Sequence, residues 1–350
     1  MALKVIEGFD NYRTAESLLQ RSGYLQWIKV PLNVVSFEQG RYQGQSIRLF
    51  LYTTLEASLA DNLHGGVLGF SFKTDSVQPQ NINLYFHDSQ APGNEYGFGG
   101  QNAQFSVTLS GQLGAVIYPG GQTASNLFPA GAWAHVEIAW TVSRNAGTLR
   151  VRVNEEKVVD LVGINTQAFS PNSWVNYLQI LAAGGIFSNI DDMYICDDTI
   201  GPGTNPCNDF LGNRRVVTLL PTSNVQTGWS ASKDTNWSAL NTGNSYNSAM
   251  TVGVEDIFKF DDLPSNVSNI AGIQVNGSYQ NTDAGGNRLT QHVVSGGSDA
   301  QGTNPLSPYG LSSTKVTYSD LFPINPATGD QWQPDALRNG KLQAGYKLES

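Results

Sequence analysis

The chain has 350 residues, enough for two domains with separate cores, and only 14% of the residues are charged. Its formal net charge of −9 excludes a nucleic-acid-binding protein of the usual kind, because such proteins need a basic surface to neutralise phosphates. No stretch approaches the roughly 18 uninterrupted apolar residues of a membrane-spanning helix, and the N-terminus lacks the apolar run of a signal peptide. We therefore expect a protein made in a cytoplasm, with no membrane insertion.

Strand patterns dominate the first two hundred residues. Short or alternating apolar runs rich in Val, Ile, Tyr, Phe and Thr are separated by Gly, Pro and Asn. Residues 15–23 form the best helix candidate, and 148–162 read as a hairpin with its turn near 154–156. The predicted strands are 46–55, 65–74, 81–89, 103–110, 134–143, 148–162 and 176–184.

A change in composition marks the predicted domain boundary. Gly, Pro and Asn cluster at residues 200–207 without an apolar period, which is typical of a linker. Many short strands and little helical periodicity predict an all-β chain, with a β-sandwich at 1–199 and a smaller C-terminal β domain at 208–350. In the second half, strands are expected at 214–222, 255–264, 270–280 and 288–297, and a short helical turn in the tail precedes a last strand.

The two cysteines leave alternatives open. Cys196 and Cys207 are too few for a disulfide framework and do not form a zinc pattern. One disulfide between them and two unpaired thiols are both compatible with the sequence.

The first half resembles the concanavalin A-like, laminin G-like jelly roll. The motifs that carry the resemblance are GFD (8–10), WAHVEI (133–138), GTLRVRVNEE (147–156), VVDL (158–161) and IDDMYI (190–195). Their order and spacing match over about 190 residues. The resemblance implies a jelly-roll sandwich, in a fold group that includes sugar-binding and calcium-binding proteins and some glycan-degrading enzymes.

Nearly the whole chain is also similar to virion proteins of tailed bacteriophages. The segments concerned are IDDMYICD (190–197), NDFLGNRRVVTLLPT (208–222), DLP (262–264), PATGDQW (326–332) and LQAGYK (342–347). This resemblance implies a non-enzymatic structural protein of the virion, in a head-decoration, neck or collar, or tail or fibre position. It also implies contacts with other virion proteins through the C-terminal domain, in a homo-oligomer or a lattice. A host-surface glycan is a further candidate partner.

The sequence offers no catalytic constellation. A retaining glycosidase of the jelly-roll type needs two carboxylates about 5 Å apart, usually on one strand. The strand at 134–143 offers only Glu137, with Ala139 and Val142 where further acids would stand. We therefore predict no catalytic residue and no cofactor. A carbohydrate-binding receptor module is the alternative function, and a glycan-degrading enzyme is the third.

Two long loops carry the candidate ligand-binding residues. Residues 87–102 and 117–133 combine aromatics, amides and glycines, a composition typical of recognition loops on a rigid sandwich. The alternative is that their aromatics cap the ends of the sandwich. The candidates for stacking on a ligand are Tyr96, Phe98, Tyr118 and Trp174.

The acidic run NIDDMYICDD (189–198) allows two interpretations. Asp191 and Asp192 are candidate cation ligands, although a calcium site needs several converging oxygen ligands. The apolar alternation also slips at this pair, which predicts a β-bulge whose acids accept backbone N–H bonds. Asp197 and Asp198 are expected in solvent, after the end of the strand.

Overall fold

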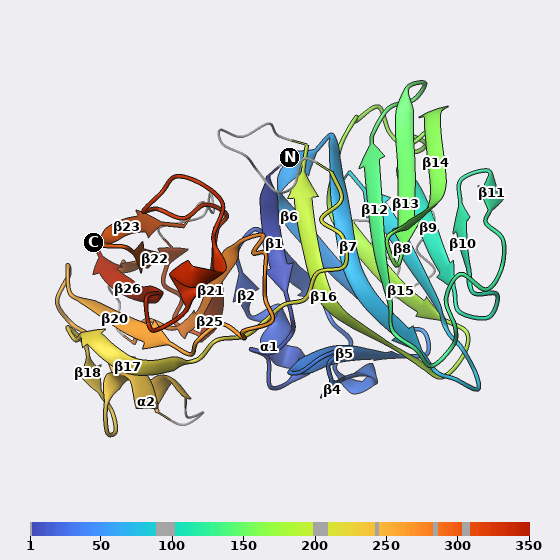
Figure 1. The fold of residues 1–350 in the computed structure, drawn as a ribbon. Coiled ribbons are helices and arrows are strands. Elements are labelled where there is room, and N and C mark those ends of the chain that lie inside the picture. The colour runs from blue at the N-terminus through green and yellow to red at the C-terminus, as the bar shows by residue number, and fades with distance from the viewer. Residues whose placement is uncertain (1, 89–101, 199–208, 242–244, 283–285, 303–308) are drawn as a thin grey trace. The chain divides into compact units, whose positions relative to one another are not determined.

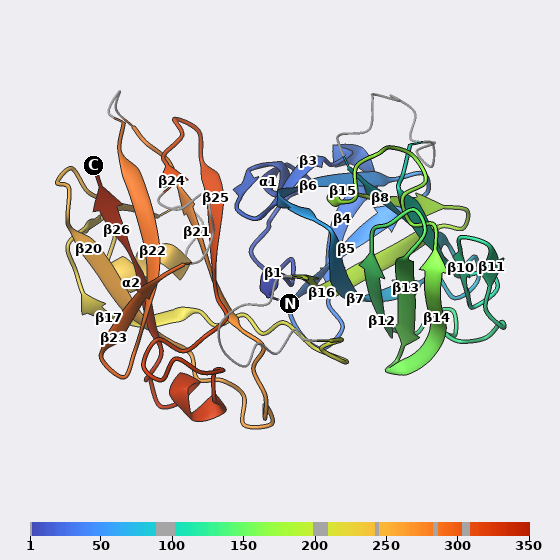
Figure 2. The same cartoon turned by 90° about the horizontal axis from the view of Figure 1, so that it is seen from above.

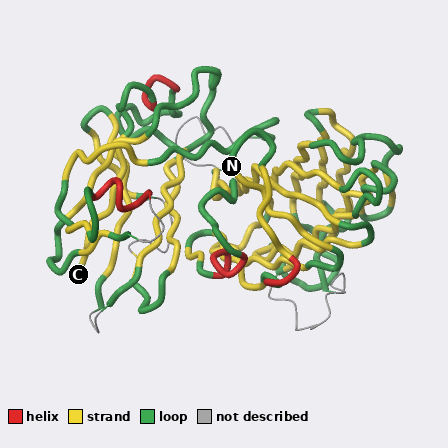
Figure 3. The backbone as a smooth tube through the Cα atoms, turned by 90° about the horizontal axis from the view of Figure 1, so that it is seen from below, coloured by secondary structure: helices red, strands yellow, loops and turns green. Residues whose placement is uncertain are grey.

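The computed structural model of the protein describes residues 2–88, 102–198, 209–241, 245–282, 286–302 and 309–350. They divide into two compact units. Residues up to Asp198 together with 209–216 form the first, and the second begins at Val217. Strands dominate both units and the helices are short, so the predicted all-β fold is confirmed (Figure 3). Within the described residues, no helix is long and apolar enough to cross a membrane.

Two antiparallel β-sheets build the first unit (Figures 1 and 2). The first sheet contains β1 (Leu3–Glu7), β4 (Val35–Gln39), β5 (Gln45–Phe50), β7 (Gly65–Thr74), β12 (Ala134–Thr141), β13 (Gly147–Val153), β14 (Glu156–Ile164) and β16 (Phe187–Asp197). Their order is β14-β13-β12-β7-β16-β5-β4, with β1 also paired to β16. The second sheet contains β3 (Leu25–Lys29), β6 (Thr54–Leu63), β8 (Asn81–His87), β9 (Phe105–Ser110), β10 (Ala115–Tyr118), β11 (Gly121–Gln122) and β15 (Val175–Ala183). Its order is β11-β10-β9-β8-β15-β6-β3.

The core of this unit lies between the two sheets. On β12, Val136, Ile138 and Trp140 are buried in it, as their alternation in the sequence predicts. The Trp140 ring lies 4.9 Å from that of Phe86 on β8, so the two sheets meet through aromatic contacts. Such contacts add to the apolar burial that stabilises a sandwich. Three further elements complete the unit: α1 (Ala15–Leu19), β2 (Arg21–Ser22) and η1 (Leu32–Val34).

Three sequence predictions differ from the structure in their bounds. The stretch 46–55 is not one strand, because β5 ends at Phe50 and Tyr52 has a φ of +60°, which turns the chain before β6. The helix at 15–23 ends at Leu19. The strand predicted at 214–222 begins only at Pro221 in the structure. Residues 209–216 instead form an irregular segment of the first unit. The sequence places that segment in the C-terminal domain.

The predicted bulge in β16 is confirmed. The pairing of β16 with β7 shifts register between Asp191 and Tyr194. Asp192 has a φ of +51°, a left-handed conformation that a residue of a regular strand does not adopt. The residues beyond the bulge continue the strand in pairing with both β7 and β1.

The second unit contains a larger and two smaller antiparallel strand groups. The larger sheet contains β17 (Pro221–Gln226), β20 (Glu255–Phe260), β22 (Arg288–Ser295), β23 (Ser298–Gln301), β24 (Tyr309–Gly310) and β26 (Gln343–Glu349). Its order is β17-β20-β26-β22-β23, with β24 also paired to β22. The other elements are β18 (Ser230–Ala231) paired with β19 (Asn247–Ser248), β21 (Ile273–Tyr279) paired with β25 (Val316–Phe322), α2 (Asn236–Asn241) and η2 (Pro334–Leu337). Trp332 and Phe322 lie in the core of this unit.

Candidate functional site

The outer face of the second sheet concentrates polar and aromatic side chains on neighbouring strands. In β8 and β15 the residues that alternate with the core residues point to this face. Register brings Tyr177 opposite His87, and Gln179 opposite both Tyr85 and Glu56. We call this set the second-sheet face; its members are Lys29, Glu56, Asn83, Tyr85, His87, Ser106, Thr108, Tyr177 and Gln179.

Glu56 organises the centre of this face. Its carboxylate accepts hydrogen bonds from the Tyr177 hydroxyl and from Gln179 Nε2, the latter at 3.2 Å. Lys29 Nζ lies 3.1 Å from the same carboxylate and is 40% exposed. Burial, together with the charge of Glu56, raises the pKa of Tyr177, so this hydroxyl stays protonated and keeps donating. Glu56 on β6 therefore holds Lys29 of β3 and Tyr177 and Gln179 of β15 in one arrangement.

His87 contributes a neutral imidazole beside this network. Its Nδ1 lies 3.2 Å from the carbonyl oxygen of Asn102, so Nδ1–H donates to that carbonyl. Burial lowers the pKa of His87, which favours the neutral ring. The ring is 5.8 Å from that of Tyr177 and nearly perpendicular to it. His87 Nε2 and Gln179 Oε1 are both buried, and the side chains of these two residues interact, which partly offsets the effect of burial on the pKa of His87.

A half-buried rim surrounds this buried centre. Tyr85 stands between His87 and Asn83 on its face of β8, with Ser106 opposite it on β9. Asn83 Oδ1 accepts a 2.7 Å hydrogen bond from Thr108 Oγ1, and Asn83 Nδ2 donates to the Leu181 carbonyl at 3.4 Å, which leaves the second N–H of the amide at the rim. The rim thus presents one aromatic ring and several uncharged donors and acceptors.

Such an arrangement suits a polyhydroxyl ligand. Uncharged amides, hydroxyls and a neutral imidazole can each donate to or accept from a sugar hydroxyl. An accessible aromatic ring offers an apolar surface of defined orientation, and small-molecule sites combine such rings with a few placed polar groups.

The ligand-binding residues predicted from the loops do not form this face. Tyr96 and Phe98 lie outside the described residues. Tyr118 is the last residue of β10 and packs against the core, and Trp174 precedes β15 and meets the His64 ring edge-on at 6.0 Å. Because β8 and β9 separate β10 from β15 in the sheet, the structure does not bring Tyr118 and Trp174 into one site. Both remain candidates for capping the sandwich.

Sequence reasoning missed the second-sheet face, although a signal was available. In 81–87 the polar and aromatic residues recur at alternate positions, as do Tyr177 and Gln179 in the strand at 176–184. This period places them on one face of each strand. That the two strands are neighbours, and that Glu56 joins them, depends on pairing between residues far apart in the sequence.

Asp191 and Asp192 have structural roles. Asp191 accepts the backbone N–H groups of Arg41 and Asp192, both at 2.7 Å, and Asp192 Oδ1 accepts that of Val216 at 2.7 Å. The predicted role of these acids at the bulge is confirmed. Within the described part of the chain, no group of three or more His, Cys, Asp or Glu residues could hold a metal ion.

The end of β16 corrects one expectation about the acidic run. Asp197 is not in solvent: it belongs to β16, is buried, accepts the backbone N–H of Ala2 at 2.7 Å and lies 3.1 Å from Lys4 Nζ. Pairing with β7 explains this, because Asp197 lies opposite Gly66 and β16 therefore extends one residue past Cys196. Asp198 is exposed, as expected. Cys196 is disulfide-bonded; Cys207 lies outside the described residues, so their pairing stays a prediction.

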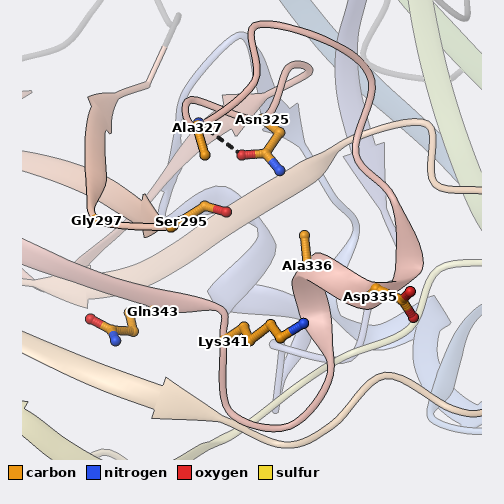
Figure 4. A pocket seen from close by; sticks show the side chains of 9 residues that line it. Ser295, Gly297, Asn325, Ala327, Asp335, Ala336, Lys341 and Gln343 are labelled. Carbon is orange, nitrogen blue, oxygen red and sulfur yellow. Dashed lines mark hydrogen bonds between the residues drawn. The ribbon is translucent and has the colours of Figure 1, made fainter.

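The second unit holds a shallower candidate pocket of about 480 Å³ (Figure 4). It lies between the β22–β23 turn, the 325–327 turn and the residues around η2. The side chain of Asn325 serves its own turn, since Oδ1 accepts the backbone N–H of Ala327 at 2.9 Å. Lys341 and Asp335 at the rim are exposed. Ser295 and Asn325 are buried polar residues of the lining, but the described lining residues include no aromatic ring, so the second-sheet face is the stronger site.

Comparison with known proteins gives weak likenesses only. No protein-family model and no curated protein matches the chain. Similar solved structures include the alginate lyase Aly36B, at 10% identity and TM-score 0.37, covering 56% of this chain and 98% of the lyase. The catalytic domain of a glycoside hydrolase family 131 protein from Coprinopsis cinerea is similar at 15% identity and TM-score 0.37, covering 58% and 97%. Lectin II from Ulex europaeus follows at 10% identity and TM-score 0.34, covering 57% and 100%. Likeness at this level carries no argument about activity.

Proposed function

We propose that the first unit is a carbohydrate-binding module and that the second-sheet face is its binding surface. The observation that carries the proposal is the arrangement of Tyr85, His87, Tyr177 and Gln179 around Glu56, which places a half-buried aromatic ring beside a cluster of hydrogen-bonded polar side chains. These groups are held rigidly by adjacent strands rather than by loops, so little ordering is needed when a ligand binds.

The chemistry of the face favours a neutral glycan. Lys29 and Glu56 are its charged members, and they lie 3.1 Å apart, so their charges offset one another. A strongly anionic ligand would meet no cluster of unpaired cations among the members of the face. A neutral sugar can instead stack on Tyr85 and exchange hydrogen bonds with the half-buried Asn83, Ser106 and Thr108 at the rim.

A glycan array is the first test. Labelled wild-type protein and Tyr85→Ala are applied to neutral and acidic glycans side by side. We expect wild-type binding to one class of neutral glycans and a signal at least tenfold lower for Tyr85→Ala, because the stacking ring is lost. Lys157→Ala, an exposed residue of β14 in the first sheet, is the matched control and should bind as wild type does. Equal binding by Tyr85→Ala would contradict the proposed surface.

The absence of catalysis is a separate part of the proposal. It is supported by the single acid on the 134–143 strand: Glu137 accepts hydrogen bonds from the Tyr194 hydroxyl and from the backbone N–H of Gly212. Incubation with each array-positive glycan should release no reducing end and produce no unsaturated sugar. A measurable rate of either product, lost in a Tyr177→Phe variant, would overturn this part.

The place of the protein in a particle is proposed on the sequence resemblance alone. We propose a structural role in a tailed-phage virion, with glycan binding as adhesion and with other virion proteins as partners. Electron microscopy of purified particles labelled with an antibody against this chain would test it. Absence of the chain from purified particles would contradict the virion role and leave glycan binding to be judged by the array.

A further inference from the structure

The outer face of the first sheet is covered by an irregular piece of this chain, the 209–216 segment. This segment belongs to the first unit and has no helix or strand. Backbone N–H groups in it donate to side chains of the sheet and of the β13–β14 turn. The pairs, donor first, are Leu211 with Tyr194 Oη (3.3 Å), Gly212 with Glu137 Oε1 (2.7 Å), Asn213 with Glu155 Oε1 (3.1 Å) and Val216 with Asp192 Oδ1 (2.7 Å).

The start of the segment is recognised by two arginines on β13. Asp209 lies 3.6 Å from Arg150 and 4.0 Å from Arg152. The Phe210 ring lies under both guanidinium groups, with its centroid 4.2 Å from Cζ of Arg152 and 5.5 Å from that of Arg150. Guanidinium groups bind carboxylates and stack on aromatic rings, so the pair matches an acidic residue followed by an aromatic one.

The middle of the segment requires a glycine. Gly212 has a φ of +78°, a conformation that L side chains rarely adopt, and its N–H reaches Glu137 from there. Leu211 before it is buried. Asn213 after it accepts a 2.6 Å hydrogen bond from Arg41 Nη1. Side chains of this face therefore contact each residue of the sequence Asp-Phe-Leu-Gly-Asn.

From these contacts we propose that the outer face of the first sheet is a peptide-docking surface, that the 209–216 segment is its built-in occupant, and that the same segment of a second copy of this chain can take its place. The contacts are made by side chains of the sheet with a segment that has no regular structure. They therefore depend on the chemistry of the segment and not on its covalent connection. Charge is complementary, since the arginines meet Asp209 and the acids meet N–H groups.

The built-in fit is also incomplete, which favours exchange. Glu137 Oε2 is buried and has no hydrogen-bond partner within the described structure. An unsatisfied buried acceptor of this kind is unfavourable, so it weakens docking of the segment. Burial correspondingly raises the pKa of Glu137.

Peptide binding to the full-length chain tests this proposal. The probe is a fluorescent peptide of residues 209–216 (DFLGNRRV), and the acceptor is Asp209→Ala/Phe210→Ala, which weakens the built-in segment. We expect this double variant to bind the peptide at least tenfold more tightly than wild type, whose own segment competes. Adding Arg150→Ala/Arg152→Ala should weaken binding at least tenfold, because the acidic and aromatic contacts are lost. Lys347→Ala/Glu349→Ala on β26 of the second unit is the matched control and should leave binding unchanged.

Hydrogen exchange shows whether the segment has opened in the double variant. We expect the amides of Leu211, Gly212 and Val216 to exchange faster than in wild type while the amides of β12 and β16 keep their protection. Open amides without peptide binding would overturn the proposal. Amides that stay fully protected would also overturn it, because docking would then not depend on the contacts with Arg150 and Arg152. General loss of protection marks unfolding; Asp209→Asn/Phe210→Leu then replaces the double variant and is judged by the same outcomes.

Discussion

Asp191 and Asp192 make the stability of the first unit depend on pH in a direction that can be measured. Burial and the neighbouring Asp192 charge raise the pKa of Asp191 to about 7, and burial raises that of Asp192 to about 6. Both values exceed the unfolded value of about 3.9. The folded state therefore binds these protons more tightly, and the stability linked to them is complete below about pH 4 and lost as the pH rises through 7.

The variant Asp191→Asn tests this dependence. We expect its free energy of unfolding, relative to wild type, to increase by about 1–2 kcal/mol between pH 5 and pH 8, because the neutral amide removes the charge that burial disfavours. Urea unfolding at several pH values measures the difference. Asp160→Asn on exposed β14 is the control and should show no such increase. Parallel stability curves for wild type and Asp191→Asn would show that the buried pair does not titrate in this range.

Asp256 is the corresponding buried acid of the second unit. Its carboxylate accepts the backbone N–H groups of Gly228 and Trp229 at 2.8 and 2.9 Å, the Asn236 amide at 2.7 Å and the Tyr346 hydroxyl at 3.1 Å. Removing it leaves several buried donors unsatisfied, each at a cost of about 1–3 kcal/mol.

We therefore expect Asp256→Ala to lower the free energy of unfolding of the second unit by about 3–5 kcal/mol. Chemical denaturation followed by tryptophan fluorescence would measure it, since Trp229 and Trp332 report on this unit. The control is Asp335→Ala, whose side chain is 88% exposed and should change stability by less than about 0.5 kcal/mol. A loss at Asp256 no larger than that of the control would contradict the assigned role.

At the residue scale, the sequence predicts which residues share a face of a strand but not which strands are neighbours. The bulge at Asp191 could be predicted because the slip in alternation is local. The second-sheet face could not, because Glu56 and Tyr177 are more than a hundred residues apart and meet only through the β6–β15 pairing. The sequence favours aromatics of predicted loops, such as Tyr118, which the structure places at the end of β10, over Tyr85 within a strand.

Thr166 joins the ends of two strands. It follows β14, and its hydroxyl accepts the backbone N–H of Ser143 at 3.0 Å and donates to the carbonyl of Thr141, the last residue of β12, at 2.7 Å. Thr166 is fully buried. The hydroxyl thus satisfies the backbone N–H of Ser143, which lies beyond the end of β12.

Thr166→Val keeps the shape and removes both hydrogen bonds, so we expect a loss of about 1–3 kcal/mol in the free energy of unfolding of the first unit. Thr148→Val is the matched control: its hydroxyl pairs with that of Thr141 on the exposed side of β12 and β13, and the change should cost about 0.5 kcal/mol or less. Denaturant unfolding of both variants provides the comparison. Equal effects of the two substitutions would contradict the role of Thr166.

At the element scale, the apolar periodicity of the sequence predicts most strands, but it fails where tertiary contacts decide whether a segment forms a strand. The strand at 65–74 has the predicted bounds, since its residues from Val67 to Phe72 include no charged residue and no turn. The stretch 214–222 has high β-propensity but remains irregular as far as Leu220. Near its start, the backbone N–H of Val216 donates to Asp192 instead of to a neighbouring strand, and no local sequence pattern predicts this contact.

At the scale of the whole molecule, the prediction of an all-β jelly-roll sandwich followed by a smaller β unit is confirmed. The fold does not itself specify a function, because unrelated activities share it. The functional account rests on the second-sheet face, whose polar groups come from several strands of one sheet and exist as a site only in the assembled unit.

Isothermal titration of the best-bound array glycan into wild type, Tyr85→Ala and Tyr118→Ala tests this account most directly. The account predicts that Tyr85→Ala weakens affinity at least tenfold and that Tyr118→Ala binds within twofold of wild type, because Tyr118 lies across β9 from the strand that carries Tyr85. The opposite pattern, with affinity lost in Tyr118→Ala and kept in Tyr85→Ala, would contradict it and return the binding site to the loops.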